Sequence, residues 1–215
     1  DRLFALPAGV EANRAILAAN METALNIVWD SGAGLGDKIV VVGAGVVGSL
    51  TAYLLAQIPG TEVTLVDLNP HRARIAEVLG CGFASPDQAP SPCDVVINTS
   101  GSESGLVRAL ELAGPEATVV EASWHGDKSV TLPLGKSFHS QRLRIVSSQV
   151  GHVPPTRAPR WTSARRMSKA LELLADDRLD VLISGETPFA DLPAKYGTIV
   201  TNPETLCHRV VYDTV

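Results

Sequence analysis

The sequence predicts an α/β protein with a doubly wound parallel sheet, which is the Rossmann type of fold. Short segments of β-branched apolar residues alternate with segments of helical period, and the first such strand is Lys38–Val42 (KIVVV). A strand that is apolar at every position is typical of a parallel sheet covered on both faces. The alternation leaves room for right-handed crossovers between successive strands. A glycine-rich turn at residues 43–48, directly after the first strand, favours the same fold.

The N-terminal part predicts a turn followed by a long helix. Residues 3–10 (LFALPAGV) are apolar and end in Pro-Ala-Gly, which indicates the end of a strand and a turn. Residues 11–29 contain neither glycine nor proline and have a helical period, so we expect a helix of about five turns. The repeated glycines of residues 31–36 end it.

From Asp37 onward the pattern is regular. A proline near the start of the second helix fits the usual preference of helix N-termini, and a Pro/Ser-rich link precedes the third strand. We expect strands at residues 38–42, 62–66, 93–99, 117–122 and 143–148, and helices at 46–58, 70–79 and 104–112.

The pattern loosens after Gly151. Residues 153–162 contain three prolines and predict a loop. Residues 163–174 predict an amphipathic helix with Met167, Leu171 and Leu174 on one stripe. We further expect a sixth strand at 179–183, a weaker helix at 188–200 and a terminal strand at 208–212.

Composition excludes several classes of protein. Hydrophobic residues make up 45% of the 215 residues and charged residues 19%, so the chain can bury a large core. The net charge of −5 argues against a nucleic-acid partner, and no apolar run approaches the roughly 18 residues that cross a membrane. Three scattered cysteines suit neither a disulfide framework nor a four-thiolate zinc site, which favours a reducing, cytoplasmic compartment. Because the chain begins at Asp1 rather than Met, we expect a piece of a longer protein.

The motif that carries chemistry is G-x-G-x-x-G at residues 43–48. It follows a buried strand and opens a helix, the context in which this motif binds dinucleotides. Gly43 makes the tight turn, Gly45 lets the backbone approach a pyrophosphate, and Gly48 permits close contact between helix and strand. Val46 and Val47 begin the helix, where free N–H groups meet negative charge.

Asp67 closes the second strand, nineteen positions after Gly48. Its carboxylate would accept hydrogen bonds from the adenosine ribose and would repel a 2′-phosphate, so NAD(H) is expected in preference to NADP(H). The alternative is a glycine-rich turn with a surface aspartate and no ligand. Arg72, early in the next helix, either reaches the ribose or adenine or is a solvated helix arginine.

Further candidates follow the later strands, because ligands of such sheets bind at the carboxyl ends of the strands. Glu121 is a carboxylate at the end of an apolar strand, where burial is costly unless the group is paired or functional. It is either a catalytic or substrate-orienting acid or the structural partner of a nearby arginine. His125 is either a proton carrier or an ordinary loop histidine. Backbone and hydroxyl groups near a nicotinamide are expected from Thr99, Ser100, Ser123 and Ser147.

Five basic residues fall in a stretch without acidic residues. A loop and a solvated helix face explain them, and a contact with an anionic substrate is the alternative. They are Arg157, Arg160, Arg165, Arg166 and Lys169.

Several segments match, in order, a known family. They are PAGV, the Ala-rich helix with Glu22-Thr23-Ala24, then GAGLGDKIVVVGAGVVG, LVDLNPHR, DVVINTSG and VVEASWHG. Together they resemble the cofactor-binding half of the medium-chain dehydrogenase/reductase superfamily, to which the zinc-type alcohol dehydrogenases belong. The similarity covers nearly the whole chain. In that family a GroES-like catalytic domain comes before the cofactor domain, and the last strand returns to it.

The resemblance implies roles for further residues. Thr23 matches a threonine that touches the nicotinamide, and Arg209 matches an arginine near the pyrophosphate. Members with catalytic zinc often carry a Cys or Glu ligand about four residues before that threonine. Here the neighbourhood is Ala-Ala-Asn at 18–20, which favours a zinc-independent member without a metal site.

The resemblance also implies an organisation and an assembly. Residues 1–30 would be a linker and first helix at the junction of the catalytic and cofactor domains. Residues 31–186 would form the NAD-binding Rossmann domain, and residues 187–215 a helix and strand returning to the catalytic domain. A homodimer through the sheet edge is expected, with residues 130–146 contributing.

The leading functional hypothesis is an NAD(H)-dependent oxidoreductase that transfers a hydride between nicotinamide and a small alcohol or carbonyl substrate. This chain would supply the dinucleotide-binding part and be inactive alone. One alternative is a stand-alone NAD(H)-binding sensor or regulatory module without turnover. Another is a site for a different adenine-containing ligand, such as a methyl donor, although Arg209 and the strand-five contacts favour the dehydrogenase.

Overall fold

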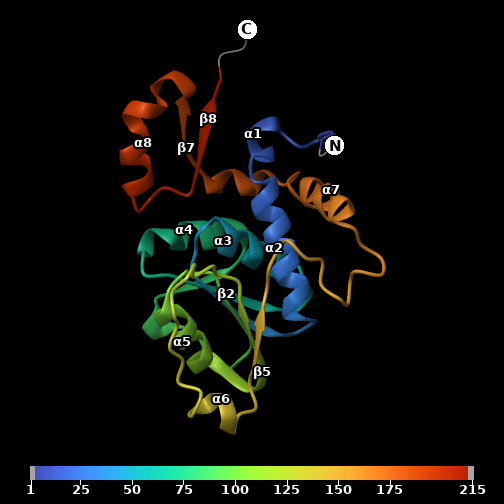
Figure 1. Cartoon of the computed structure of the whole chain (residues 1–215), viewed down its shortest axis with the longest axis vertical. Coiled ribbons are helices and arrows are strands. Elements are labelled where there is room, and N and C mark those ends of the chain that lie inside the picture. The colour runs from blue at the N-terminus through green and yellow to red at the C-terminus, as the bar shows by residue number, and fades with distance from the viewer. Residues whose placement is uncertain (1–2, 213–215) are drawn as a thin grey trace.

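The computed structural model describes residues 3–212, and in this part of the chain a six-stranded sheet forms the centre of the molecule (Figure 1). The strands lie in the order β3-β2-β1-β4-β5-β6, and every neighbouring pair is parallel. The doubly wound prediction is therefore confirmed. The strands are β1 (Lys38–Val42), β2 (Glu62–Val66), β3 (Gly82–Ala84), β4 (Cys93–Asn98), β5 (Ala113–Glu121) and β6 (Arg144–Ser147).

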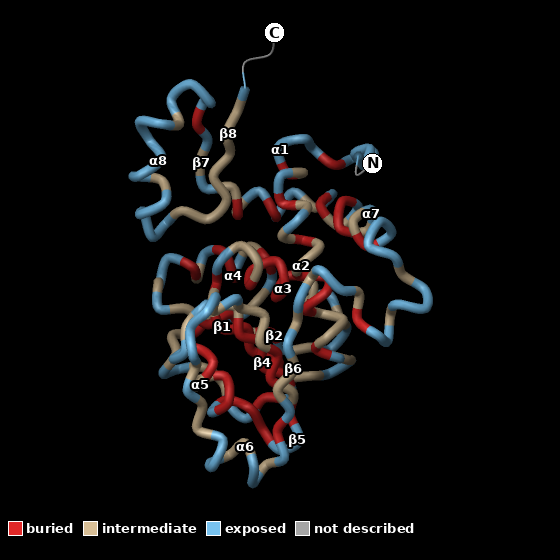
Figure 2. The backbone as a smooth tube through the Cα atoms, viewed as in Figure 1, coloured by how far each residue is buried: buried red, intermediate tan, exposed pale blue. Residues whose placement is uncertain are grey.

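Helices cover both faces of this sheet. The alternating side chains of β1 divide between two cores: Val40 packs toward α5, whereas Val41 packs toward α2, α3 and α4. A further apolar layer joins α2 and α3 to α7, and Figure 2 shows buried residues both in the strands and on the helices packed against them. The helices are α1 (Ala12–Ala15), α2 (Ala18–Ser31), α3 (Val46–Leu55), α4 (Ala73–Leu79), α5 (Glu103–Leu112), α6 (Ser137–Ser140) and α7 (Ser163–Leu173).

The N-terminal prediction needs two corrections. Residues 3–7 form no strand, and only the turn at residues 8–9 is present. The single helix expected over 11–29 is divided into α1 and α2 at Leu17, whose side chain is fully buried among α2, α3 and α7. Burying Leu17 there redirects the chain, although neither glycine nor proline marks the break.

The expected strand at 179–183 is wrong. Residues Asp177–Leu182 form a 3₁₀ helix, which begins after Asp176, and the Asp176 side chain accepts a hydrogen bond from the Arg178 N–H. Three residues per turn bring Leu179 and Leu182 to the same buried side. The apolar run that suggested a strand therefore reflects this helical period.

The C-terminal residues form a small βαβ unit that stands apart from the main sheet (Figure 1). Strand β7 (Ile183–Pro188) pairs in parallel with β8 (Cys207–Val211), and α8 (Leu192–Thr201) connects them after a 3₁₀ turn at Phe189–Asp191. The expected helix and terminal strand are both present. α8 is largely exposed (Figure 2).

Two findings bear on partners. Between residues 3 and 212, no helix combines the length and the apolar character that a membrane crossing requires. β6 forms one edge of the main sheet, and a dimer contact is expected at this edge. That contact stays a prediction.

Candidate functional site

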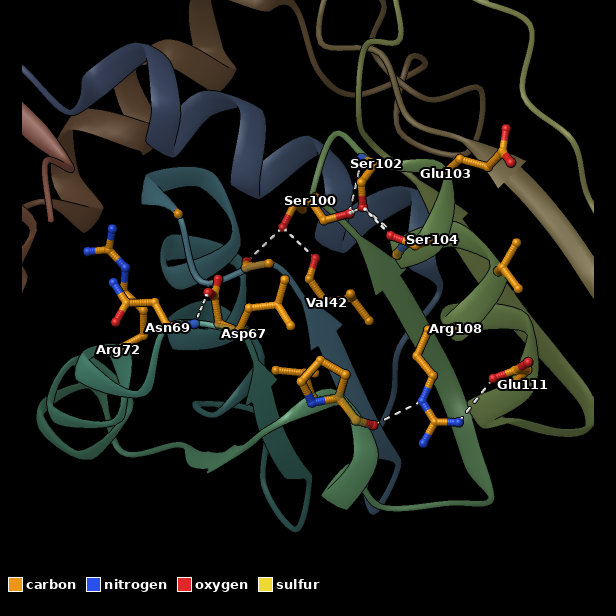
Figure 3. A pocket seen from close by; sticks show the side chains of 18 of the residues that line it. Val42, Asp67, Asn69, Arg72, Ser100, Ser102, Glu103, Ser104, Arg108 and Glu111 are labelled. Carbon is orange, nitrogen blue, oxygen red and sulfur yellow. Dashed lines mark hydrogen bonds and ion pairs between the residues drawn. The ribbon is translucent and has the colours of Figure 1, made fainter. Parts of the chain in front are cut away.

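A cavity of about 970 Å³ opens at the carboxyl ends of β1, β2 and β4 (Figure 3). The chain runs from β1 outward through β2 to β3 and then returns to β4 on the other side of β1. The cavity thus lies at the topological switch point, where open α/β sheets bind their ligands. Among the residues that line it are Gly43, Gly45, Asp67, Asn69, Arg72, Thr99, Ser100, Glu103, Arg108 and Pro203.

The glycine turn is built against the loop that follows β4. Gly43 has a φ of +100°, and a Cβ atom there would stand 2.9 Å from the Ser100 backbone. A Cβ on Gly48 would overlap the Gly43 carbonyl oxygen and stand 2.5 Å from the Thr99 hydroxyl oxygen. The Thr99 hydroxyl in turn lies within hydrogen-bond distance of the Val42 and Gly43 carbonyl oxygens, at 3.0 and 2.9 Å. Only glycine fits at positions 43 and 48.

Gly45 is different, because it faces open space. It is the N-cap residue of α3, and in the described chain no atom outside its neighbours lies within 4 Å of a Cβ built there. A glycine N-cap has no side chain to satisfy the first N–H groups of a helix, so these groups can meet an anion. Val46 and Val47 turn their side chains toward apolar clusters, so we expect only their backbones to contact a ligand.

Asp67 lies in the same cavity as the glycine turn. Its Oδ2 accepts a hydrogen bond from the Ala44 N–H at 2.7 Å, and its Oδ1 accepts one from the Asn69 N–H at 2.9 Å. The carboxylate is therefore held in place by two backbone groups. Each oxygen keeps a second lone pair that can accept a hydroxyl.

One of the two interpretations of Arg72 is wrong. Arg72 is only 8% exposed, so it is not a solvated helix arginine. Its guanidinium donates to the Pro203 carbonyl oxygen at 2.7 Å and to that of Glu204 at 3.5 Å, while the residue still lines the cavity. The Asn69 side-chain amide donates to the Glu204 carboxylate at 2.7 Å. Sequence reasoning missed Asn69, Pro203 and Glu204.

A second polar group joins the ends of β4 and β5. Asn98 is fully buried and donates to Glu121 Oε2 at 2.7 Å, and Glu121 Oε1 accepts from the Ser123 N–H at 2.6 Å. His125 Nε2 lies 3.6 Å from Glu121 Oε2. The arginine expected as the structural partner of Glu121 is not among its contacts within residues 3–212. The register explains this, because Asn98 is directly opposite Glu121 in the sheet.

The loop after β4 ties this group to the cavity. Ser100, which lines the cavity, hydrogen-bonds to Asn98 Oδ1 through its hydroxyl at 2.7 Å. The Ser123 hydroxyl accepts a hydrogen bond from the Gly101 N–H at 3.0 Å. Asn98 was also missed, although a polar residue at the end of the apolar segment VVIN was a readable signal.

Nine predicted residues lie outside the cavity lining: Val46, Val47, Gly48, Glu121, Ser123 and His125, which are placed above, and Thr23, Ser147 and Arg209. The Thr23 hydroxyl donates to the Ala19 carbonyl oxygen within α2 at 3.0 Å. Ser147 ends β6 with its residue exposed. Arg209 forms an ion pair with Glu186 across the β7–β8 pair. Their roles toward a ligand stay predictions.

The basic stretch is not a uniformly solvated face. Arg166 is 2% exposed, and it donates to Glu22 Oε1 at 3.0 Å and to Asn26 Oδ1 at 2.5 Å, both on α2. Arg157 and Arg165 lie over the rings of Trp29 and Trp161, at 5.5 and 4.1 Å from the ring centroids. The stretch therefore fastens the loop before α7 to α2 by contacts that sequence spacing did not reveal. Within the same described part of the chain, no three His, Cys, Asp or Glu residues are grouped to hold a metal ion.

The chain is similar to several known dehydrogenases. A family model described as "Ketopantoate reductase PanE/ApbA" matches residues 39–104, the unit from β1 to the start of α5. The D-guloside 3-dehydrogenase of Escherichia coli is 27% identical over 209 residues, which cover 91% of this chain and 60% of the relative. The 2-dehydro-3-deoxy-L-galactonate 5-dehydrogenase of Pseudoalteromonas atlantica is 26% identical over an alignment of 216 residues with gaps. The alignment covers 94% of this chain and 59% of the relative.

A solved structure extends the likeness to the fold. The L-idonate 5-dehydrogenase of Escherichia coli superposes with a TM-score of 0.80 at 18% identity, covering 96% of this chain and 59% of that one. The chain thus spans about 60% of the length of the curated relatives it matches. From these likenesses and the glycine-turn cavity, the chain is a relative of the zinc-type medium-chain dehydrogenases/reductases and corresponds to their cofactor-binding half.

Proposed function

We propose that the chain is the dinucleotide-binding part of an NAD(H)-dependent oxidoreductase that transfers a hydride between nicotinamide and an alcohol or carbonyl substrate. The observation that carries this proposal is the position of Asp67. Its carboxylate and the open backbone of Gly45 line one cavity at the switch point of the sheet. A diphosphate at the start of α3 and a ribose diol at Asp67 would satisfy both features.

The residues present fit such a cofactor. The space above Gly45 is the kind of cradle that a Cβ atom would fill, and a phosphate needs it empty. A cavity of about 970 Å³ is at the upper end of the range for small-molecule sites, as a dinucleotide requires. The negative charge of Asp67 opposes a 2′-phosphate, so NAD(H) is the cofactor that we propose.

The chemistry divides between cofactor and protein. When bound, the nicotinamide ring supplies the hydride acceptor or donor. Oxidation of an alcohol also releases its hydroxyl proton, and Glu121 and His125 are this chain's candidates to hold it. His125 Nε2 lies 3.6 Å from Glu121 Oε2, so a modest movement of either side chain would bring the two groups within hydrogen-bond distance. Asn98 and the Ser123 N–H would keep the carboxylate oriented for that role.

The substrate class that we propose is a hydroxyl group of a sugar or sugar acid. This comes from the names of two relatives, a guloside dehydrogenase and a deoxygalactonate dehydrogenase. Because the chain spans about 60% of their length, turnover is proposed for the whole protein to which it belongs.

Isothermal titration of the purified chain with NADH and with NADPH tests the proposal. We expect saturable binding of NADH and weaker binding of NADPH. Equal or tighter binding of NADPH would overturn the cofactor assignment. A titration without binding of either dinucleotide would overturn the proposed function itself.

A further inference from the structure

The segment between α8 and β8 reaches the rim of the nucleotide cavity. Pro203 lines the cavity, and Glu204 beside it contacts the cavity residue Asn69. These contacts join parts of the chain that are 131 to 135 positions apart. A C-terminal segment is thus built into the wall of the site that carries Asp67.

The segment between α8 and β8 supplies the hydrogen-bond acceptors for the Arg72 guanidinium. In Rossmann sites an arginine near the ribose accommodates the 2′-phosphate of NADP(H). Arg72 has the right charge and lines the cavity, on the same wall as Asp67 and Asn69 (Figure 3). Its guanidinium is directed instead to the carbonyl oxygens of Pro203 and Glu204, at 2.7 and 3.5 Å. A phosphate would have to compete with these carbonyl oxygens for the buried cation.

The same segment also carries a negative charge, on Glu204. Asn69 is fixed on three sides: its N–H donates to Asp67, its Oδ1 accepts from the His71 N–H at 3.0 Å, and its amide donates to Glu204 at 2.7 Å. Asn69 therefore links the Glu204 carboxylate to the Asp67 carboxylate through its side-chain amide and its backbone N–H. A ligand phosphate near Asp67 would meet two negative groups rather than one.

We propose that Pro203 and Glu204 act as a second determinant of cofactor choice, which discriminates against a dinucleotide carrying a 2′-phosphate. Pro203 and Glu204 engage Arg72 through their carbonyl oxygens, and Glu204 adds a carboxylate that hydrogen-bonds to Asn69, the same residue that donates to Asp67. This inference rests on the proposed NAD(H) function and assigns part of the selectivity to a segment far from the glycine motif. The ligand class selected is a dinucleotide with a free ribose diol.

The test is Glu204→Gln, measured by isothermal titration with NADH and NADPH. Glutamine keeps an oxygen that can accept from the Asn69 amide and removes only the charge. We expect NADPH affinity to rise about three- to tenfold, because the carboxylate is exposed and partly screened. NADH affinity should change less than twofold.

Glu77→Gln is the matched control, since Glu77 is an exposed residue of α4 that pairs with Arg74 outside the cavity lining. It removes the same charge and should leave both affinities unchanged. If Glu204→Gln changes neither affinity, or raises both equally, the inference is overturned while NADH binding by the unaltered chain still supports the proposed function. If the unaltered chain binds neither dinucleotide, the proposed function fails first.

The salt dependence of NADH and NADPH binding tests the same charge effect independently. Repulsion between Glu204 and a 2′-phosphate is screened at high ionic strength. The ratio of NADH to NADPH affinity should therefore fall as salt rises in the unaltered chain, and fall less in Glu204→Gln. Identical salt dependence in the two proteins would count against a charge effect.

Discussion

Gly48 lies directly against the Gly43 carbonyl oxygen, so the first and third glycines of the motif touch at the turn from β1 into α3. The Thr99 hydroxyl, within hydrogen-bond distance of that same oxygen, occupies the remaining space. Position 48 is therefore required by the fold itself, whereas position 45 faces the open cavity. This difference allows the structural and the ligand-binding roles of the motif to be separated by experiment.

Gly48→Ala should destabilise the fold, and Gly45→Ala should not. The added Cβ at position 48 overlaps backbone, so we expect a loss of about 3 kcal/mol in the free energy of unfolding, the upper end for overpacked sites. At position 45 the change should stay within about 1 kcal/mol, while NADH affinity falls about tenfold or more because the backbone can no longer approach the diphosphate. Urea unfolding and calorimetry measure the two quantities. A stable Gly45→Ala that binds NADH normally would contradict the placement of the diphosphate.

Asp67→Asn should weaken NADH binding about tenfold to a hundredfold, since a hydrogen bond to a charged group contributes roughly 1.5–3 kcal/mol. In the variant, the asparagine NH₂ group would also face one of the two backbone N–H groups that donate to the Asp67 carboxylate in the unaltered chain. NADPH should lose less affinity, because repulsion of its 2′-phosphate is relieved. Asp127→Asn is the control. It removes the same charge from an exposed residue, and it should leave both affinities unchanged. Parallel losses for NADH and NADPH would argue against a selective role for Asp67.

The parts of the site that sequence could predict are local. The strand, glycine turn, helix and Asp67 lie within one βαβ unit, where spacing alone fixes their relation. Contacts between distant segments left no such signal. Nothing near Arg72 indicates that it meets Pro203, and Glu121 faces Asn98 only because β4 and β5 are neighbours in a particular register.

The same limit explains the errors in secondary structure. The apolar run at 179–183 suits a strand or a short helix equally, and the side-chain cap from Asp176 decides for the 3₁₀ helix. β3 has only three residues and was missed, because so short a strand shows no period. Its pairing with β2 supplies what its own sequence does not.

Arg166→Met should cost about 3–5 kcal/mol in the free energy of unfolding, as breaking a buried ion pair typically does. The change leaves Glu22 and Asn26 of α2 without the guanidinium that now joins them to α7. Arg165→Met is the matched control, since Arg165 is exposed and stacks on Trp161. Its loss should cost about 1 kcal/mol or less. Equal effects of the two changes in urea unfolding would contradict the structural role given to Arg166.

Acid should destabilise the contact between α3 and the 3₁₀ helix through Asp176. The side-chain hydrogen bond from Arg178 is the main reason that the pKa of Asp176 is lowered from 3.8 to about 2, and the Tyr53 hydroxyl also donates to this carboxylate. A lowered pKa in the folded state means that this contribution to stability is fully present above about pH 4. It is lost as the pH falls from there toward 2.

The urea midpoint should therefore drop more steeply between pH 4 and pH 2 in the unaltered chain than in Asp176→Asn, which is already less stable at pH 7. Asp180 titrates in the same direction, because its hydrogen bond with Arg14 lowers the pKa of that carboxyl. Some acid sensitivity should thus survive in Asp176→Asn and diminish further when Asp180→Asn is added. If the pH dependence of Asp176→Asn matched that of the unaltered chain, the Tyr53–Asp176–Arg178 contact would not contribute to acid sensitivity.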